Sequence, residues 1–268
     1  NRHSEEPLEM KIATWNINSV RLRLETVLAF LQQADIDVLC LQETKTQDMH
    51  FPTEAFAAAG WPNQAIRGEK SYNGVAIIAR QPLAKIDHME WTGKSDCRHI
   101  WAMTNDGIGI HNFYVPAGGD VPDIEANPKF AHKLQFIDEM TSHFSANQPK
   151  AEILVGDLNI APLASDVWSS KQLLKIISHT PVETDGLKRL IADGGWHDAV
   201  RAYFGDDQKL YSWWSYRARD WAASDRGRRL DHIWVSHDLA DKVTHAEIHR
   251  DWRGVDKPSD HVPVSLTL

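Results

Sequence analysis

The sequence has little cysteine and no long apolar stretch, and each absence excludes a class of protein. Two cysteines, Cys40 and Cys97, are too few for a disulfide framework in 268 residues, so we expect a reducing, cytoplasmic compartment. No run approaches the roughly 18 apolar residues of a transmembrane helix, so we expect no membrane association. Residues 1–20 carry charges where a signal peptide would need an apolar stretch, so we expect no signal peptide.

The chain also lacks a Ser/Gly/Pro-rich linker, a repeat of fixed period and any break in composition. Hydrophobic residues make up 42% and charged residues 25%, which is typical of globular proteins and excludes a fibrous or wholly disordered chain. We therefore expect a single α/β domain at residues 10–268. Residues 1–9 show no periodicity, and we expect them to be disordered or derived from an expression vector.

Charge is distributed unevenly. There are 37 acidic and 29 basic residues, a net charge of −8, which argues against binding nucleic acid over the whole surface. Residues 217–229 are an exception, with five arginines against two aspartates, and four of the 11 tryptophans lie in or beside this segment. Large aromatic side chains commonly fill a core between packed sheets. Arginine beside aromatic rings is also the chemistry that binds phosphates and stacks on bases, so both interpretations stay open.

The apolar pattern predicts alternating strands and helices in the first two thirds of the chain and mostly strands after that. Strands are predicted at residues 11–15, 38–41, 74–79, 99–103, 108–115, 153–155, 211–216, 230–235, 244–249 and 263–268. Helices are predicted at residues 20–31, 128–144, about 166–178 and about 185–193. Asn127 and Pro128 form a start signal for the second helix. The irregular residues 116–127 are a candidate substrate loop.

Polar side chains recur at the ends of the predicted strands. Asn16 and Asn18 follow the first strand, Glu43 follows the second, Asp157 and Asn159 follow a third, and Asp260 and His261 precede the last. One aspartate at a strand end is more often a cap or turn residue. Repetition of carboxylates and amides at several strand ends indicates a ligand site instead. Oxygen donors without a Cys/His cluster suit Mg²⁺, with Mn²⁺ as a substitute, rather than zinc.

Eight short motifs occur in a distinctive order. They are Trp15-Asn16-Ile17-Asn18, Leu41-Gln42-Glu43-Thr44-Lys45, Asn73-Gly74-Val75-Ala76, Tyr114-Val115-Pro116, Gly156-Asp157-Leu158-Asn159, Tyr211-Ser212-Trp213-Trp214, Arg229-Leu230-Asp231-His232 and Ser259-Asp260-His261. In this order they closely resemble the exonuclease III family of abasic-site endonucleases, within the endonuclease/exonuclease/phosphatase superfamily. The resemblance covers residues 10–268.

The resemblance implies a four-layer α/β sandwich, with two mixed β-sheets packed face to face and helices on both outer faces. It also implies an Mg²⁺-dependent DNA repair nuclease of base excision repair that acts on duplex DNA as a monomer, near the nucleoid if the source is bacterial. Such an enzyme incises 5′ to abasic sites and removes nucleotides or blocking groups from 3′ ends, as a 3′–5′ exonuclease and 3′-phosphatase. Two alternatives stay open: a superfamily phosphodiesterase or phosphatase acting on RNA or small phosphoesters, and a catalytically inactive DNA-binding module.

The resemblance also assigns roles to individual residues. The metal set is Glu43 as the main ligand, with Asn16, Asn18 and Asp260 near it, and Lys45 supporting Glu43 or the phosphate. The catalytic set is Asp157 and Asn159, which position water and phosphate, Tyr114 on the scissile phosphate, and His261 oriented by Asp231. Either Asp157 or His261 could take the proton from water, and a charged His261 could instead donate to a phosphate oxygen. The sequence leaves that choice open.

Basic residues outside these sets are candidates for contacts with duplex phosphates. They are Lys129, Lys133, Arg217, Arg219, Arg226 and Lys257. Lys129 and Lys133 are one helical turn apart, so both can face the same way, and a solvated helix face is the alternative for each. Trp213 matches the position where the family walls a pocket for an extruded abasic sugar. Arg228 stands where relatives usually have an apolar or aromatic pocket residue, and Ala117 replaces an amide; both leave the balance of activities open.

Overall fold

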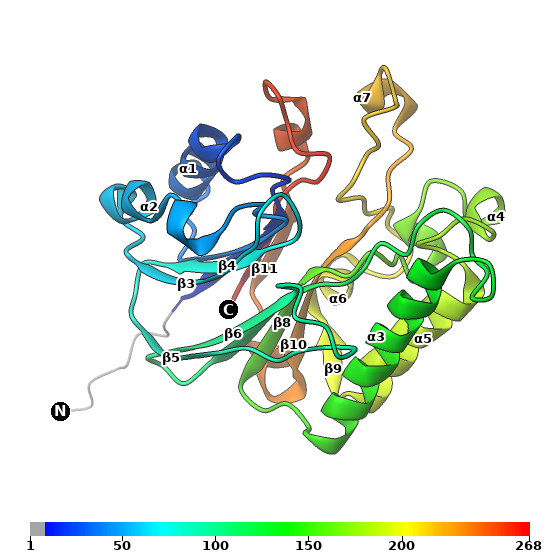
Figure 1. Ribbon diagram of the computed structural model, residues 1–268, viewed down its shortest axis with the longest axis horizontal. Coiled ribbons are helices and arrows are strands. Elements are labelled where there is room, and N and C mark those ends of the chain that lie inside the picture. Colours follow the sequence, from blue (N-terminus) through cyan, green and yellow to red (C-terminus); the bar gives the residue numbers. More distant parts are fainter. Residues whose placement is uncertain (1–8) are drawn as a thin grey trace.

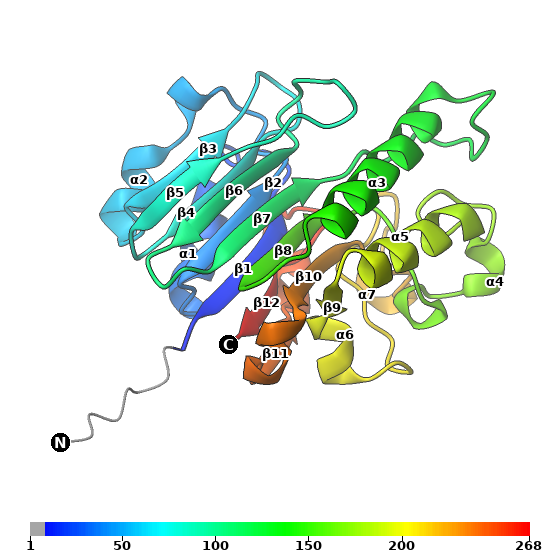
Figure 2. The ribbon, with the colours of Figure 1, turned by 90° about the horizontal axis from the view of Figure 1, so that it is seen from below.

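The computed structural model describes residues 9–268, whose strands form two mixed six-stranded sheets (Figures 1 and 2). Sheet A has the order β11-β12-β1-β2-β4-β3, and sheet B has the order β5-β6-β7-β8-β10-β9. The strands of sheet A are β1 (Lys11–Asn16), β2 (Val38–Gln42), β3 (Asn63–Arg67), β4 (Val75–Ala79), β11 (His245–Ile248) and β12 (Val264–Thr267). Those of sheet B are β5 (Leu83–Asp87), β6 (His99–Thr104), β7 (Gly109–Tyr114), β8 (Glu152–Asp157), β9 (Trp196–Asp198) and β10 (Asp231–Ser236).

The α-helices are α1 (Leu24–Gln33), α2 (Thr53–Ala59), α3 (Pro128–Ala146), α4 (Ser170–Leu173), α5 (Pro181–Asp193), α6 (Ala199–Phe204) and α7 (Trp221–Ser224). Four of them lie on the outer faces of the sheets. α1 and α2 cover sheet A, and α3 and α5 cover sheet B (Figure 1). Separate apolar clusters fill the spaces between the sheets, between sheet A and its helices, and between sheet B and its helices. The predicted four-layer α/β sandwich is therefore confirmed.

Burial on both faces explains the continuous apolar strands. All five residues of β2 and all five of β4 are buried, because one face of sheet A packs on helices and the other on sheet B. β1 runs parallel to β2, with Asn16 opposite Gln42, and β7 runs parallel to β8, with Tyr114 opposite Asp157. Parallel pairing brings the carboxyl ends of these strands to one edge, where the polar residues follow.

A buried amide network joins the two sheets across the central core. Asn112 of β7 donates to the carbonyl oxygens of Leu41 and Ala76 in sheet A, each at 3.0 Å. Gln42 donates to Asn112 Oδ1 at 2.8 Å and to Thr14 Oγ1 at 2.9 Å. Asn112 and Gln42 have no exposed surface. Since a buried polar group left without a partner destabilises the fold, these bonds favour one position of sheet B over sheet A.

Helix predictions were correct where the cap signal was clear. α3 begins at Pro128, and the side chain of Asn127 accepts a hydrogen bond from the Lys129 amide at 3.0 Å, as expected. The helix predicted from residue 20 begins only at Leu24. The helix predicted from about residue 185 begins at Pro181, where Thr180 and Glu183 form a capping box that the periodicity did not reveal.

Two predictions of secondary structure were wrong. The helix predicted at about 166–178 shrinks to Ser170–Leu173, because Asp166 is engaged by buried arginines and the following residues line a cavity. The strand predicted at 211–216 is replaced by isolated bridges from Trp213 to Arg228 and His261.

Two further expectations concern segments outside regular structure. Residues 116–127 form no helix or strand, as expected. Of residues 1–9, which were expected to be disordered, residues 1–8 lie outside the described part of the chain. Among the helices of residues 9–268, none has the length and apolar character needed to span a membrane.

Candidate active site

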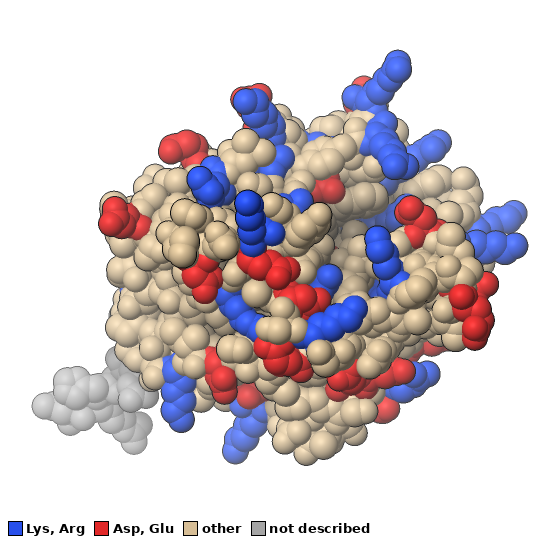
Figure 3. All heavy atoms as spheres, viewed as in Figure 1, with Lys and Arg blue, Asp and Glu red and all other residues tan. Residues whose placement is uncertain are grey.

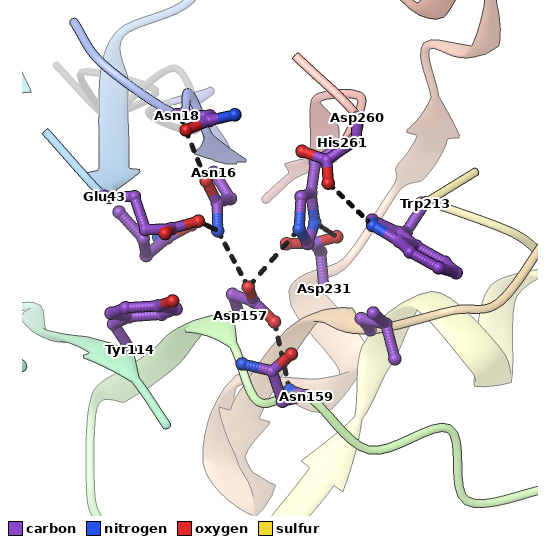
Figure 4. Close-up of polar contacts among 12 residues, drawn as sticks. Asn16, Asn18, Glu43, Tyr114, Asp157, Asn159, Trp213, Asp231, Asp260 and His261 are labelled. Atoms are coloured by element: carbon purple, nitrogen blue, oxygen red, sulfur yellow. Dashed lines mark hydrogen bonds and ion pairs between the residues drawn. The ribbon is translucent and has the colours of Figure 1, made fainter. Parts of the chain in front are cut away.

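Polar side chains from both sheets meet at the shared edge (Figure 4). Asn16, at the end of β1, donates through Nδ2 to Glu43 Oε2 at 2.6 Å and to Asp157 Oδ2 at 2.9 Å. Asn16 and Asp157 are buried, whereas the side chain of Glu43 keeps 21% of its surface exposed. One amide thus holds a carboxylate of sheet A beside a carboxylate of sheet B.

The backbone around these side chains adopts an uncommon conformation. Four site residues other than glycine have positive φ angles: Asn18, Glu43, Lys45 and Asn159, at 45–55°. Side chains with a Cβ adopt this region rarely, and such residues often mark functional sites. Gly156 has φ 146°, and a Cβ there would lie 1.9 Å from the Phe113 carbonyl oxygen, so only glycine fits before Asp157.

His261 lies between two carboxylates in a buried chain. Its Nδ1 donates to Asp231 Oδ2 at 2.7 Å, and its Nε2 lies 3.5 Å from Asp157 Oδ2. The hydroxyl of Ser212 donates to Asp231 Oδ2 at 2.7 Å and accepts from the amides of Leu230 and Asp231. The predicted orientation of His261 by Asp231 is thus present in the structure, with Nε2 directed toward Asp157.

Charge around His261 changes its proton affinity and that of Asp157. Burial alone would lower the pKa of His261, but Asp231 and Asp157 raise it well above its usual value. Burial raises the pKa of Asp157 to about 7, against the opposing effect of His261. The group of Asp231, His261 and Asp157 is therefore suited to holding and releasing a proton near neutral pH.

Tyr114 and Asn159 lie at the mouth of this group. Tyr114 ends β7, and the guanidinium of Arg98 lies 5.1 Å from the centre of its ring. Burial, with Glu43 and Asp157 nearby, raises the pKa of Tyr114 well above its usual value, so the phenol stays protonated as a donor. Asn159 donates through its backbone amide to Asp157 Oδ1 at 3.0 Å and through Nδ2 to the Val115 carbonyl at 2.7 Å.

The donor atoms at this edge suit a hard divalent cation. Asp157, Asp231 and His261 each offer a ligand atom within 4.8 Å of the others. Asp231 Oδ2, however, already accepts two hydrogen bonds, from His261 and Ser212, so this triad is better suited to proton transfer. Glu43 is a partly exposed carboxylate in the lining of the cavity, and Asp260 lines the same cavity. These carboxylate oxygens fit the metal that the family uses.

Asn18 and Lys45 form a support beside Glu43. Lys45 Nζ donates to Asn18 Oδ1 at 2.7 Å and lies 3.8 Å from Glu43 Oε1. The Asn18 amide nitrogen donates to Tyr216 Oη at 3.3 Å. The expected support of Glu43 by Lys45 is present, whereas a metal-binding role for Asn18 stays a prediction.

Lys133 corrects the prediction about phosphate contacts. Its side chain is fully buried and forms an ion pair with the buried Glu183. It also donates to the carbonyl oxygens of Asn159 at 2.7 Å and Ala117 at 3.2 Å. A buried, paired ammonium cannot contact DNA at the surface, so Lys133 instead holds the loop that carries Asn159. Lys129 is exposed and remains a candidate.

A cavity of about 840 Å³ connects the carboxylates with the tryptophan- and arginine-rich segment. Its lining includes Glu43, Tyr114, Asp157, Asn159, Trp168, Ser178, Trp213, Arg217, Arg226, Arg228, Asp260 and His261. Trp213 donates from Nε1 to Asp260 Oδ2 at 3.0 Å (Figure 4). The candidate substrate loop also contributes, through Ala117, Gly119 and Asp120. The predicted catalytic and pocket residues are thus brought together.

Other predicted cations lie outside this lining. Arg219, Lys129 and Lys257 are exposed at the surface. Lys and Arg side chains project around the face in Figure 3, with Asp and Glu side chains between them. The negative net charge therefore coexists with basic side chains on this face.

The sequence did not single out three residues of the site. Ser212 fixes Asp231, Ser178 bonds Arg228, and Trp168 lines the cavity with Arg226 stacked 4.7 Å from its ring centre. Ser212 stands within the motif Tyr211-Ser212-Trp213-Trp214, so its position was visible although its role was not. Ser178 and Trp168 lie in the segment wrongly predicted as a helix.

Comparison with known proteins agrees with this geometry. The model of the endonuclease/exonuclease/phosphatase family matches residues 13–261. Exodeoxyribonuclease III of Haemophilus influenzae is 30% identical over 268 residues, covering 95% of this chain and 98% of that protein.

Two solved structures are similar along almost the whole chain. An AP endonuclease from Archaeoglobus fulgidus has a TM-score of 0.89 and 28% identity, and covers 96% of this chain and 98% of its own. A 3′ phosphatase from Neisseria bound to a product DNA hairpin has a TM-score of 0.88 and 30% identity, with the same coverage. The chain belongs to the endonuclease/exonuclease/phosphatase family, as a phosphodiester hydrolase similar to exodeoxyribonuclease III.

Proposed function

We propose that this protein is an Mg²⁺-dependent DNA repair nuclease that hydrolyses phosphodiesters of duplex DNA as a monomer. It incises 5′ to abasic sites and removes nucleotides, phosphates or other blocking groups from 3′ ends. The observation that carries the proposal is the single cavity in which Asp157 and His261 face Trp213 and the arginines of residues 217–228. A small-phosphoester enzyme has no need of that aromatic and cationic wall.

A divalent cation would be held by Glu43, with Asp260 and the amide of Asn16 beside it. When bound, Mg²⁺ supplies positive charge to the phosphate and to the departing 3′ oxygen. Asn16 engages only Oε2 of Glu43, and the side chain is partly exposed, so Oε1, which lies 3.8 Å from Lys45 Nζ, is available to a cation. Mn²⁺ has similar ligand preferences and is expected to substitute.

The chain's own residues divide the proton transfers between them. Asp231 and Ser212 orient His261 so that Nε2 faces the cavity, where it donates a hydrogen bond to a phosphate oxygen. Asp157 accepts the proton of the attacking water, held in place by Asn16 and by the Asn159 amide. Tyr114, kept protonated, donates to another oxygen of the scissile phosphate. Fixed donors of this kind stabilise the charge that develops during attack.

Duplex binding is assigned to exposed cations around the cavity. Arg217 and Arg226 line its mouth, and Lys129, Arg219 and Lys257 extend the surface. Contacts of such side chains with phosphates position a protein without reading sequence. The structure of the Neisseria relative with a product DNA hairpin supports the same class of substrate here.

The test is a panel of duplex oligonucleotides carrying an abasic analogue, a 3′-recessed end or a 3′-phosphate, each with Mg²⁺ and with chelator. We expect cleavage of all three with Mg²⁺ and none with chelator. Cleavage of none of them, or hydrolysis of small phosphoesters without any action on duplex DNA, would remove the proposal. Metal identity is checked by replacing Mg²⁺ with Mn²⁺ or Ca²⁺, and the monomer by light scattering with and without the duplex.

A further inference from the structure

Two neighbouring arginines on the same segment have opposite surroundings. The guanidinium of Arg229 is fully buried and bonds the carboxylates of Asp166 and Asp198. Arg228 lines the large cavity, and among residues 9–268 no carboxylate lies within ion-pair distance of it. The acid whose charge acts on it, Glu183, is already bonded by Lys133, Ser178 and Thr180. Arg229 therefore has a structural role, whereas the charge of Arg228 is not balanced within the fold.

The side chain of Arg228 is fixed although it has no acidic partner. Its Nη1 donates to Ser178 Oγ at 3.0 Å and to the Ile177 carbonyl at 3.3 Å. Its guanidinium carbon lies 5.0 Å from the centre of the Trp213 ring. Its Nε is enclosed without a hydrogen-bond partner. Its Nη2 makes no hydrogen bond with residues 9–268 and is not enclosed, so this edge of the guanidinium can take an acceptor supplied by a ligand in the cavity.

Backbone pairing through Trp213 sets the distance between Arg228 and His261. Trp213 forms a bridge to His261 on one side and to Arg228 on the other, with two 3.0 Å hydrogen bonds to Arg228. Neighbouring extended segments lie about 4.8 Å apart, so the Arg228 backbone is roughly 10 Å from that of His261. A short fragment attached to a phosphate at His261, and lying along the Trp213 ring, would bring its far end to the Arg228 guanidinium.

We propose that Arg228 is a specificity-determining residue that favours 3′ ends whose scissile phosphate carries an anionic remnant of an oxidised sugar, such as 3′-phosphoglycolate, over a neutral abasic sugar. The inference rests on the proposed function and deepens it. A carboxylate accepts hydrogen bonds from a guanidinium in a geometry that lysine cannot reproduce. A neutral sugar in the same place would leave the cation without a partner, and the chain offers no carboxylate to replace it.

The experiment compares three duplex substrates: a one-nucleotide gap with a 3′-phosphoglycolate, the same gap with a 3′-phosphate, and an internal tetrahydrofuran abasic analogue. Variants are Arg228→Leu, Arg228→Lys and, as a matched control, Arg250→Leu, which removes an arginine stacked on Trp221 outside the cavity. We expect Arg228→Leu to lower the ratio of kcat/KM for phosphoglycolate to that for tetrahydrofuran by about 10-fold or more, since a charge-assisted hydrogen bond is lost. Arg228→Lys should fall between wild type and Arg228→Leu, and Arg250→Leu should leave the ratio within about twofold.

An unchanged ratio in Arg228→Leu, or a loss confined to tetrahydrofuran, overturns this inference while the proposed function stands. Wild-type protein that cleaves none of the substrates overturns both. If Arg228→Leu does not fold, as judged by its melting transition, inhibition of the wild-type enzyme decides instead. We expect 2-phosphoglycolate to inhibit at about 10-fold lower concentration than ethyl phosphate, and equal inhibition by the two compounds would contradict the inference.

Discussion

Two chains of histidine and carboxylate lie within the fold, and only one of them is suited to catalysis. In the first, His261 is hydrogen-bonded to Asp231 and faces Asp157. In the second, Met89 N–H donates to His99 Nδ1, His99 Nε2 lies 3.0 Å from His111 Nδ1, and His111 Nε2 lies 3.2 Å from Glu152. The Met89 bond fixes the tautomer of His99, so His99 donates to His111 and His111 donates to Glu152.

The two chains differ in the charges that surround them. Carboxylates flank His261 and raise its pKa well above the usual value despite burial. Burial lowers the pKa of His99 far below the usual value, and the neighbours that act on it (His111, Arg67, His88 and His143) lower it further. Both chains join imidazole rings to carboxylates, but the first has one histidine between two buried aspartates, and the second has two histidines and ends at the partly exposed Glu152. What distinguishes a proton-transfer site from a structural hydrogen-bond chain is therefore the sign of the surrounding charge.

The largest loss of activity is expected when the side chains of the first chain that take part in proton transfer are replaced. His261→Ala and Asp157→Asn are each expected to lower kcat/KM on an abasic duplex by about 10²–10⁴, because acid–base function is lost. The matched change in the second chain, His111→Ala, should leave the activity of folded protein within about threefold. Near-normal rates in His261→Ala would place the reaction elsewhere.

The next largest effect on the rate is expected when the terminal carboxylate of a chain is replaced by an amide. Asp231→Asn should lower kcat/KM by about 10- to 100-fold, because a hydrogen bond to a charged imidazole contributes about 1.5–3 kcal/mol. Glu152→Gln is the control, and we expect no measurable change in rate. Equal behaviour of the two variants in steady-state kinetics would show that the two chains do not differ as described.

The second chain should make the free energy of unfolding depend on pH. His99 is neutral in the folded state and takes up a proton on unfolding at pH below about 6.5, so the free energy of unfolding falls as the pH drops through that value. Each such histidine contributes a slope of up to about 1.4 kcal/mol per pH unit. His232, with its pKa lowered by burial to about 4, contributes in the same direction between pH about 6.5 and 4.

Urea unfolding from pH 8 to 4.5 measures that slope. His99→Asn should be less stable at pH 8 but should show a shallower decline than wild type. An identical slope would mean that His99 does not titrate on unfolding.

The smallest effect concerns cations outside both chains. Arg217→Ala and Lys129→Ala should each reduce the slope of log Kd against log salt concentration by about one, if each side chain contacts a DNA phosphate. Their effect on the chemical step in single-turnover assays should be slight. Lys257→Ala extends the comparison to the edge of the surface, and an unchanged salt slope in all three variants would remove the proposed duplex contacts.

The sequence predicted most strands and the polar residues at their ends because these signals are local, whereas the four layers were implied by the resemblance to the exonuclease III family. Runs such as Val38–Leu41 and Ile153–Val155 are apolar on both faces, and the polar residues after them could only lie at the strand ends. The sequence did not predict what long-range pairing decides. Asp166 leaves its expected helix because Arg201 and Arg229 surround it, and Trp213 bridges two distant segments.

The position of Lys133 in its helix could have predicted that its side chain is buried. It lies three residues after Phe130 and four before Ile137, on the stripe of α3 that is buried against sheet B and α5. A charged residue at a core position of a helix calls for a buried partner, here Glu183 of α5. The one-turn spacing from Lys129 wrongly placed Lys133 on the exposed face of α3. Its position within the apolar stripe determines its burial instead.

The amide network of Asn112 and Gln42 bears on how activity relates to folding. Asn16, Glu43 and Asp260 come from sheet A and its flanking loops, and Asp157 and Asp231 come from sheet B. Neither half alone contains a complete catalytic centre, so turnover requires that the halves be locked in one lateral alignment. Catalysis is thus a sensitive reporter of how these halves dock, and a lesion deep in the interior, such as Asn112→Leu, could abolish repair while leaving each half well ordered.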